Sequence, residues 1–145
     1  MKKTLSVAAL SLTLSCLIAA AQNSAYWPDP SWKAPPAAVA QVNPLANRPE
    51  LARGGRKLFL RNCAECHGKD GTGKAKKHSA NLQFPAIQLQ TDGELFWKIT
   101  NGNTGREMPS FSKLPEPERW QIVMYLRELK PRSTSERREH INNGF

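Results

Sequence analysis

The sequence has little cysteine, few acidic residues and no convincing strand pattern. Three cysteines among 145 residues are too few for the disulfide framework that stabilises many small secreted domains. Twelve acidic residues stand against 21 basic ones, and the formal net charge of +9 favours acidic protein partners or anionic surfaces. The sequence shows neither an internal repeat nor a nucleic-acid-binding motif, which disfavours nucleic acid as a partner. What remains is a small, basic protein of one domain.

The first residues have the layout of a secretory signal peptide, which we place at 1–21. Lys2 and Lys3 precede an apolar stretch, and three alanines end it at Ala21. Cleavage after Ala21 predicts export to the periplasm. The apolar stretch lies at the lower limit of the roughly 17–25 residues that span a bilayer, so an uncleaved anchor is the alternative. Cys16 lacks a good lipobox before it, and we interpret it as a small apolar residue of the removed segment.

Residues 22–48 form a segment that is rich in proline and nearly free of charge. Because proline fixes φ and removes a backbone donor, a regular helix is excluded over most of this segment. Tyr26, Trp27 and Trp32 are aromatic residues that a freely solvated linker rarely needs. We therefore predict an extended arm whose aromatic side chains pack on the domain or on a partner, with a disordered tether as the alternative. At the other end of the chain, residues 131–145 form a polar tail.

Residues 49–130 carry helical patterns that are separated by long loops. The first helix presents one face at spacings of three and four and ends at Cys63. That face consists of Leu51, Gly55, Leu58, Phe59 and Asn62. Thr91 and Glu94 predict a capping box at the start of a second helix, and a last helix is expected over about 115–129. About 80 residues in three or four helices give a small hydrophobic core, so this all-α domain is expected to need a cofactor or another source of stability.

The segment Cys63-Ala64-Glu65-Cys66-His67 is the most informative feature of the chain. Two thiols three positions apart can each form a thioether to one vinyl group of a porphyrin. The adjacent imidazole then reaches the iron from one face. This C-x-x-C-H spacing is the pattern of c-type haem attachment. It predicts one covalently bound haem, held by Cys63 and Cys66 and ligated by His67.

A haem held by His67 requires a second axial ligand or an open site. Met108 lies in a glycine-rich loop ahead of the last helix, and a thioether opposite histidine raises a haem's potential. We predict that Met108 is this ligand, against the alternative of a gap-filling apolar residue. Met124 lies among apolar residues of the last helix and is expected in the core. His78, which follows a basic run, and His140, in the tail, are the alternatives for a bis-histidine site.

These motifs stand in the order found in class I c-type cytochromes, which the chain resembles over residues 49–130. In that family an N-terminal and a C-terminal helix pack at a glycine–aromatic crossing. Gly55 and Phe59 match the first helix of the crossing, and Ile122 and Tyr125 match the second. The resemblance implies the cytochrome c fold, with three to four helices and long loops wrapped around one covalently bound haem.

The chain departs from that family in the loop after the haem motif. Many relatives carry a proline there, and its carbonyl accepts a hydrogen bond from the axial histidine. Residues 79–82 contain no proline, so the carbonyl of Ala80 is expected to accept this bond.

The ligand pair predicts a periplasmic carrier of single electrons between redox partners, such as a dehydrogenase and a terminal oxidase, and not an enzyme by itself. The basic run at 74–77 is expected to steer a partner with an acidic docking surface. The main alternative is a haem enzyme or gas sensor with a displaceable sixth ligand. A thiol–disulfide oxidoreductase would leave His67 and Met108 unexplained, and a zinc module would lack ligands.

Overall fold

The structure is a computed structural model that describes Asp29 and residues 31–130. The predicted signal peptide, Tyr26, Trp27, His140 and the polar tail lie outside the described residues. The described chain is helical, and its elements are α1 (Pro36–Val39), η1 (Pro49–Leu51), α2 (Ala52–Asn62), α3 (Ala64–His67), η2 (Ala75–Lys77), α4 (Pro85–Gln88), α5 (Asp92–Asn101), η3 (Thr104–Arg106) and α6 (Glu116–Glu128). Within these residues the only β contact is an isolated bridge between Asn103 and Met108. The predicted all-α fold is confirmed.

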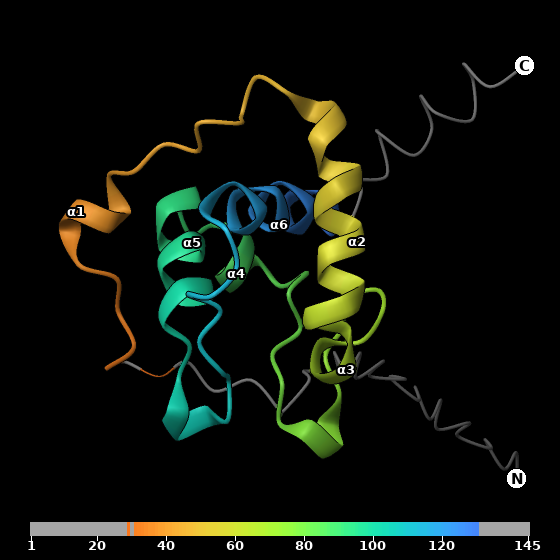
Figure 1. Cartoon of the computed structure of the whole chain (residues 1–145). Helices are drawn as coiled ribbons and strands as arrows, with labels where there is room; N and C mark the ends of the chain where they lie inside the picture. Colours follow the sequence, from red (N-terminus) through yellow and green to blue (C-terminus); the bar gives the residue numbers. More distant parts are fainter. Residues whose placement is uncertain (1–28, 30, 131–145) are drawn as a thin grey trace, which may run out of the picture.

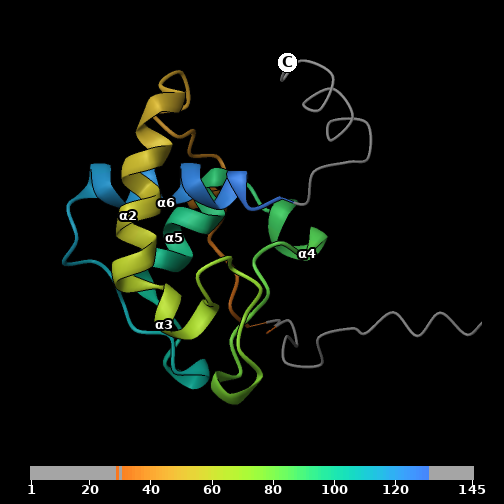
Figure 2. The same ribbon diagram turned by 90° about the vertical axis from the view of Figure 1, so that its right-hand side faces the viewer.

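The crossing of α2 and α6 forms the centre of the core, as Figures 1 and 2 show. The helices meet at Gly55, where an added Cβ would lie 1.8 Å from the backbone oxygen of Gln121. One turn further on, the Phe59 and Tyr125 rings pack with their centroids 5.2 Å apart. Phe59 is fully buried. Glycine therefore sets the distance between the helices, and the aromatic pair fills the space beside it.

Helix α5 also packs against α6. Its start is fixed by the predicted capping box, in which the Glu94 amide donates to Thr91 Oγ1 at 3.1 Å and the Thr91 amide donates to Glu94 Oε2 at 2.7 Å. The Phe96 ring stacks on Trp120 of α6, with centroids 3.9 Å apart. The helix ends at Asn101, with Gly102 as its C-cap.

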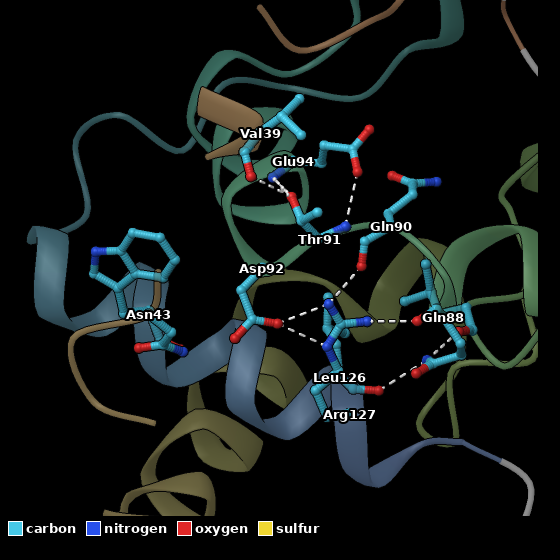
Figure 3. Close-up of polar contacts among 11 residues, drawn as sticks. Val39, Asn43, Gln88, Gln90, Thr91, Asp92, Glu94, Leu126 and Arg127 are labelled. Carbon is cyan, nitrogen blue, oxygen red and sulfur yellow. Dashed lines mark hydrogen bonds and ion pairs between the residues drawn. The ribbon is translucent and has the colours of Figure 1, made fainter. Parts of the chain in front are cut away.

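Arg127 of α6 ties together the elements that surround it, as Figure 3 shows. Its guanidinium donates to Asp92 Oδ1 at the start of α5 at 2.8 and 2.7 Å. Two further bonds reach the carbonyl oxygens of Gln88 (2.9 Å) and Gln90 (2.6 Å). A planar fork of donors suits this set of acceptors, because lysine would satisfy fewer of them.

The segment before α2 packs against the helices. Gly93 of α5 lies so close to α1 that an added Cβ would meet the Ala38 carbonyl oxygen at 1.9 Å. Asn43 is buried and donates from Nδ2 to the Trp120 carbonyl oxygen at 3.3 Å. Among the described residues, no helix is both long and apolar enough to cross a bilayer.

Candidate haem-binding site

A cavity of about 340 Å³ is lined by residues of α3 and of the loops that contain η2 and η3. These segments lie at the lower end of the view in Figure 1. That volume falls within the range of cofactor sites. Its walls come from the α3 turn, from the loop after it, from the loop after α5 and from the N-terminal arm. They include Asn62, Cys63, Glu65, Cys66, His67, Lys77, His78, Ser79, Ala80, Arg106, Glu107, Met108, Pro109, Phe111, Asp29 and Trp32. The four predicted site residues therefore share one cavity.

Cys63 and Cys66 lie on the turn that links α2 to α3. Cys63 is both the C-cap of α2 and the N-cap of α3. Its backbone amide donates to the Phe59 carbonyl oxygen at 2.8 Å. Both cysteines are half-buried, and they do not form a disulfide with each other. Burial, reinforced by the neighbouring Cys66, raises the pKa of the Cys63 thiol to about 12. A reactive redox thiol needs a lowered pKa, so this environment disfavours a thiol–disulfide oxidoreductase.

His67 is held in one orientation by the loop that follows it. Its Nδ1 lies 3.0 Å from the Ala80 carbonyl oxygen, which only accepts, so Nδ1 carries the proton and Nε2 keeps its lone pair. Burial lowers the pKa of His67, and the bond to Ala80 offsets part of that effect. A neutral imidazole with a free Nε2 is the form that ligates iron. The expected alanine carbonyl thus takes the role of the missing proline.

Ser79 is a part of this wall that the sequence analysis did not single out. Its buried hydroxyl donates to the Cys66 carbonyl oxygen at 2.5 Å and accepts from the Lys74 amide at 2.9 Å. The Gly73 amide adds a bond to the His67 carbonyl oxygen at 2.8 Å. Together these bonds fasten the attachment turn to the loop that orients its histidine. A single serine between a basic run and an apolar stretch gives no sequence signal of this role.

Met108 lies on the opposite loop and is half-buried at the cavity. Its backbone forms two hydrogen bonds with that of Asn103. The Asn103 amide donates to the Met108 carbonyl oxygen at 2.8 Å, and the Met108 amide donates to the Asn103 carbonyl oxygen at 3.0 Å. Gly102, at φ +68°, allows this fold-back, because a Cβ there would lie 2.6 Å from the Met108 carbonyl oxygen. The chain therefore presents Met108 from a short closed loop and not from a helix.

The other candidate ligands differ in position. His78 is exposed in a left-handed turn and also lines the cavity, at φ 47°. Met124 is half-buried and borders a separate shallow depression beside Ala52. Within the described residues, no cluster of three or more His, Cys, Asp or Glu side chains suits a metal ion, so the zinc alternative finds no ligand set there.

The residues at the cavity fit a haem. Two thiols lie on one turn, a neutral imidazole has its ligating nitrogen free, and a thioether lies on a separate loop. Together with the helical fold, these features define a c-type cytochrome.

The chain belongs to the family of the cbb3-type cytochrome c oxidase subunit III, whose model matches residues 50–126. The protein is thus an electron-transfer cytochrome that carries covalently bound haem c. It is similar to the cbb3-type cytochrome c oxidase subunit FixPc of Rhizobium leguminosarum bv. viciae, with 46% identity over 59 residues that cover 39% of this chain and 20% of the relative. Subunit FixP of Rhizobium meliloti (strain 1021) shares 36% identity over 56 residues, 39% of this chain and 19% of the relative. The chain therefore spans about a fifth of the length of these relatives. No solved structure matches it.

Proposed function

We propose that Cys63 and Cys66 bind the haem covalently and that His67 and Met108 ligate its iron, so that the protein carries single electrons. The observation that carries this proposal is the meeting of these four side chains at one cavity. When bound, the haem supplies reversible one-electron chemistry at iron. If His67 and Met108 both hold the iron, no position would remain at the metal for a substrate.

The other residues of the site support this role. Ala80 orients the His67 imidazole by accepting its Nδ1–H, burial keeps the ring neutral, and Ser79 fixes the turn that presents it. Phe111 and Trp32 add apolar surface to the walls. Low polarity around a haem disfavours its more highly charged oxidised form, so these walls raise the reduction potential.

We further propose that the protein acts in the periplasm and passes electrons to components of a terminal oxidase. Its two relatives are named as subunits of cbb3-type cytochrome c oxidases, which supports this assignment. Lys74, Lys76 and Lys77 are exposed on the loop beside the cavity, and Lys77 also lines it. This loop is suited to a partner with an acidic docking surface. The rate of electron transfer to such an oxidase should fall as ionic strength rises. At low ionic strength, Lys76→Glu should transfer electrons more slowly than the natural protein.

The ligand assignment is tested by the far-red absorption of the oxidised holoprotein, matured in a host that attaches c-type haem. A sulfur-to-iron charge-transfer band is expected in the natural protein and should disappear in Met108→Ala, together with a large fall in potential. Met124→Ala, a substitution of the same type outside the cavity, should leave the band unchanged. If the band survives Met108→Ala, the assignment is wrong. Covalent haem without the band in the natural protein would favour a haem enzyme or gas sensor.

The covalent attachment needs a separate test. Cys63→Ser should leave one thioether at most, and Cys63→Ser combined with Cys66→Ser should abolish the covalently bound chromophore on a denaturing gel. A haem signal that survives in the double variant would refute the attachment.

A further inference from the structure

The N-terminal arm contacts the loop that carries Met108. The Trp32 indole donates from Nε1 to the Gly102 carbonyl oxygen at 2.9 Å, across 70 residues of sequence. The ring is half-buried and lies 4.8 Å from the Lys98 ammonium of α5, a cation–π distance. Trp32 is therefore fixed between the end of α5 and the start of the loop.

A second contact lies three residues earlier in the arm. Asp29 Oδ2 accepts from Asn103 Nδ2 at 3.2 Å. Its Oδ1 accepts from the Ser31 amide at 2.9 Å and from the Ser31 hydroxyl at 2.6 Å, which closes a turn of the arm. Asp29 and Trp32 thus bind consecutive loop residues, Gly102 and Asn103.

Those two loop residues are the ones against which Met108 folds back. Asn103 exchanges two backbone hydrogen bonds with Met108, and Gly102 lies in van der Waals contact with the same segment. The far side of the loop is tied to α5 by Ser110 Oγ, which donates to the Thr100 carbonyl oxygen at 2.6 Å. A movement that carries the loop backbone away from the cavity would therefore strain or break the contacts of the arm and the Asn103–Met108 bridge.

We propose that Trp32 and Asp29 are positioning residues for the sixth ligand, so that the arm secures the Met108 loop closed over the cavity. This inference rests on the proposed role of Met108 as an iron ligand. The arm lies on the loop but supplies no ligand itself, and its effect is on the equilibrium between a closed loop and an open one. Loss of an arm contact makes Met108 easier to displace.

The test is a titration of the oxidised, full-length holoprotein with imidazole, which replaces Met108 only when the loop opens. Trp32→Phe keeps the ring and removes the donor to Gly102, and Asp29→Ala removes the acceptor for Asn103. One hydrogen bond of ordinary strength predicts that either variant binds imidazole roughly two- to tenfold more tightly. The matched control is Trp97→Phe, a half-buried tryptophan of α5 that does not line the cavity, and it should bind imidazole as the natural protein does.

The Trp32→Phe substitution made in a Met108→Ala variant distinguishes an effect on loop opening from an effect on how easily imidazole enters the cavity. In Met108→Ala there is no thioether to displace, so Trp32→Phe should no longer change imidazole affinity. An equal effect of Trp32→Phe with and without Met108 would overturn the inference. Equal effects of Trp32→Phe and Trp97→Phe, or none in either arm variant, would overturn it as well. If the natural protein lacks the sulfur-to-iron band, the failure lies in the ligand assignment and not in the arm.

Discussion

Substitution of Gly55 by alanine should weaken the fold at its centre. An ideal Cβ at this position lies 1.8 Å from the Gln121 carbonyl oxygen and 2.5 Å from its carbonyl carbon. Both are backbone atoms in the middle of α6, so neither can rotate away. The helices would have to separate by about 1.6 Å along this contact to reach an ordinary distance, which also opens the Phe59–Tyr125 pair.

The magnitude follows from two opposing effects. Forced overpacking costs about 1–3 kcal/mol, and a backbone obstacle places Gly55→Ala at the upper end of that range. Alanine is favoured over glycine inside a helix by about 1 kcal/mol, which offsets part of the cost. The net loss is therefore about 2 kcal/mol of unfolding free energy. In a domain of this size such a loss lowers the melting temperature by roughly 8–16 °C.

The neighbouring glycine supplies the control. A Cβ on Gly54 would lie 2.3 Å from Gln121 Oε1, which is the end of a flexible side chain that can turn aside. Gly54→Ala should therefore be neutral or stabilising by up to about 1 kcal/mol, because it gains helix propensity without a backbone clash. Denaturant unfolding of both holoproteins, followed by far-UV circular dichroism, measures the difference. If Gly55→Ala proves as stable as Gly54→Ala, the crossing does not depend on glycine and the reasoning is wrong.

Three further predictions concern polar contacts. Arg127→Met should lower the unfolding free energy by about 2 kcal/mol, because it leaves the Asp92 carboxylate without its cation, and Arg127→Lys should recover only part of the loss in the same denaturation assay. Thr91→Ala should cost about 1 kcal/mol through loss of the helix cap, whereas Thr91→Ser should keep most of it; equal stabilities would contradict the capping role. Hydrogen bonds from Ser31, and one from Asn103, lower the pKa of Asp29 to about 2, so its contribution to stability is complete above about pH 4 and is lost as the pH falls through 2. Carboxyl NMR should show this titration, and Asn103→Ala should move the pKa upward; an unchanged value would exclude the contact.

The parts of the fold that could be predicted are those encoded over a few residues. Thr91 and Glu94 form both bonds of the capping box because the two partners are three positions apart and need nothing else. The Gly55–Phe59 pair was found through the family pattern, and the structure gives it a steric meaning. The short helix α4 was missed, because only a long loop was expected between the haem motif and Thr91. Its single turn is held by bonds to residues outside the turn, since the Gln88 side chain donates from Nε2 both to the Leu82 carbonyl oxygen at 2.7 Å and to the Leu126 carbonyl oxygen at 3.0 Å.

Some residues of the site could likewise be predicted from the sequence, and others could not. The C-x-x-C-H turn and Met108 follow from spacing and residue type, and the structure brings them to one cavity, although their bonds to haem stay predictions. The packing of Trp32 on the domain agrees with the expectation for the arm. Its particular partner, a backbone carbonyl of Gly102, was not predictable. Every residue has a backbone carbonyl, so the residue type of the acceptor does not indicate that it forms this bond.

The position of α6 in the chain has a consequence for how the protein is made. Among the described residues, none that lines the cavity lies on α6, yet α6 supplies Ile122 and Val123, two of the most deeply buried side chains. Of the helices that the structure describes, α6 is therefore synthesised last, and it is the one that completes the core. Until it arrives, Phe59 lacks the Tyr125 ring, and the core on which Cys63 packs is incomplete. The order of synthesis therefore leaves an interval in which both thiols are open to chemistry that the finished fold would obstruct.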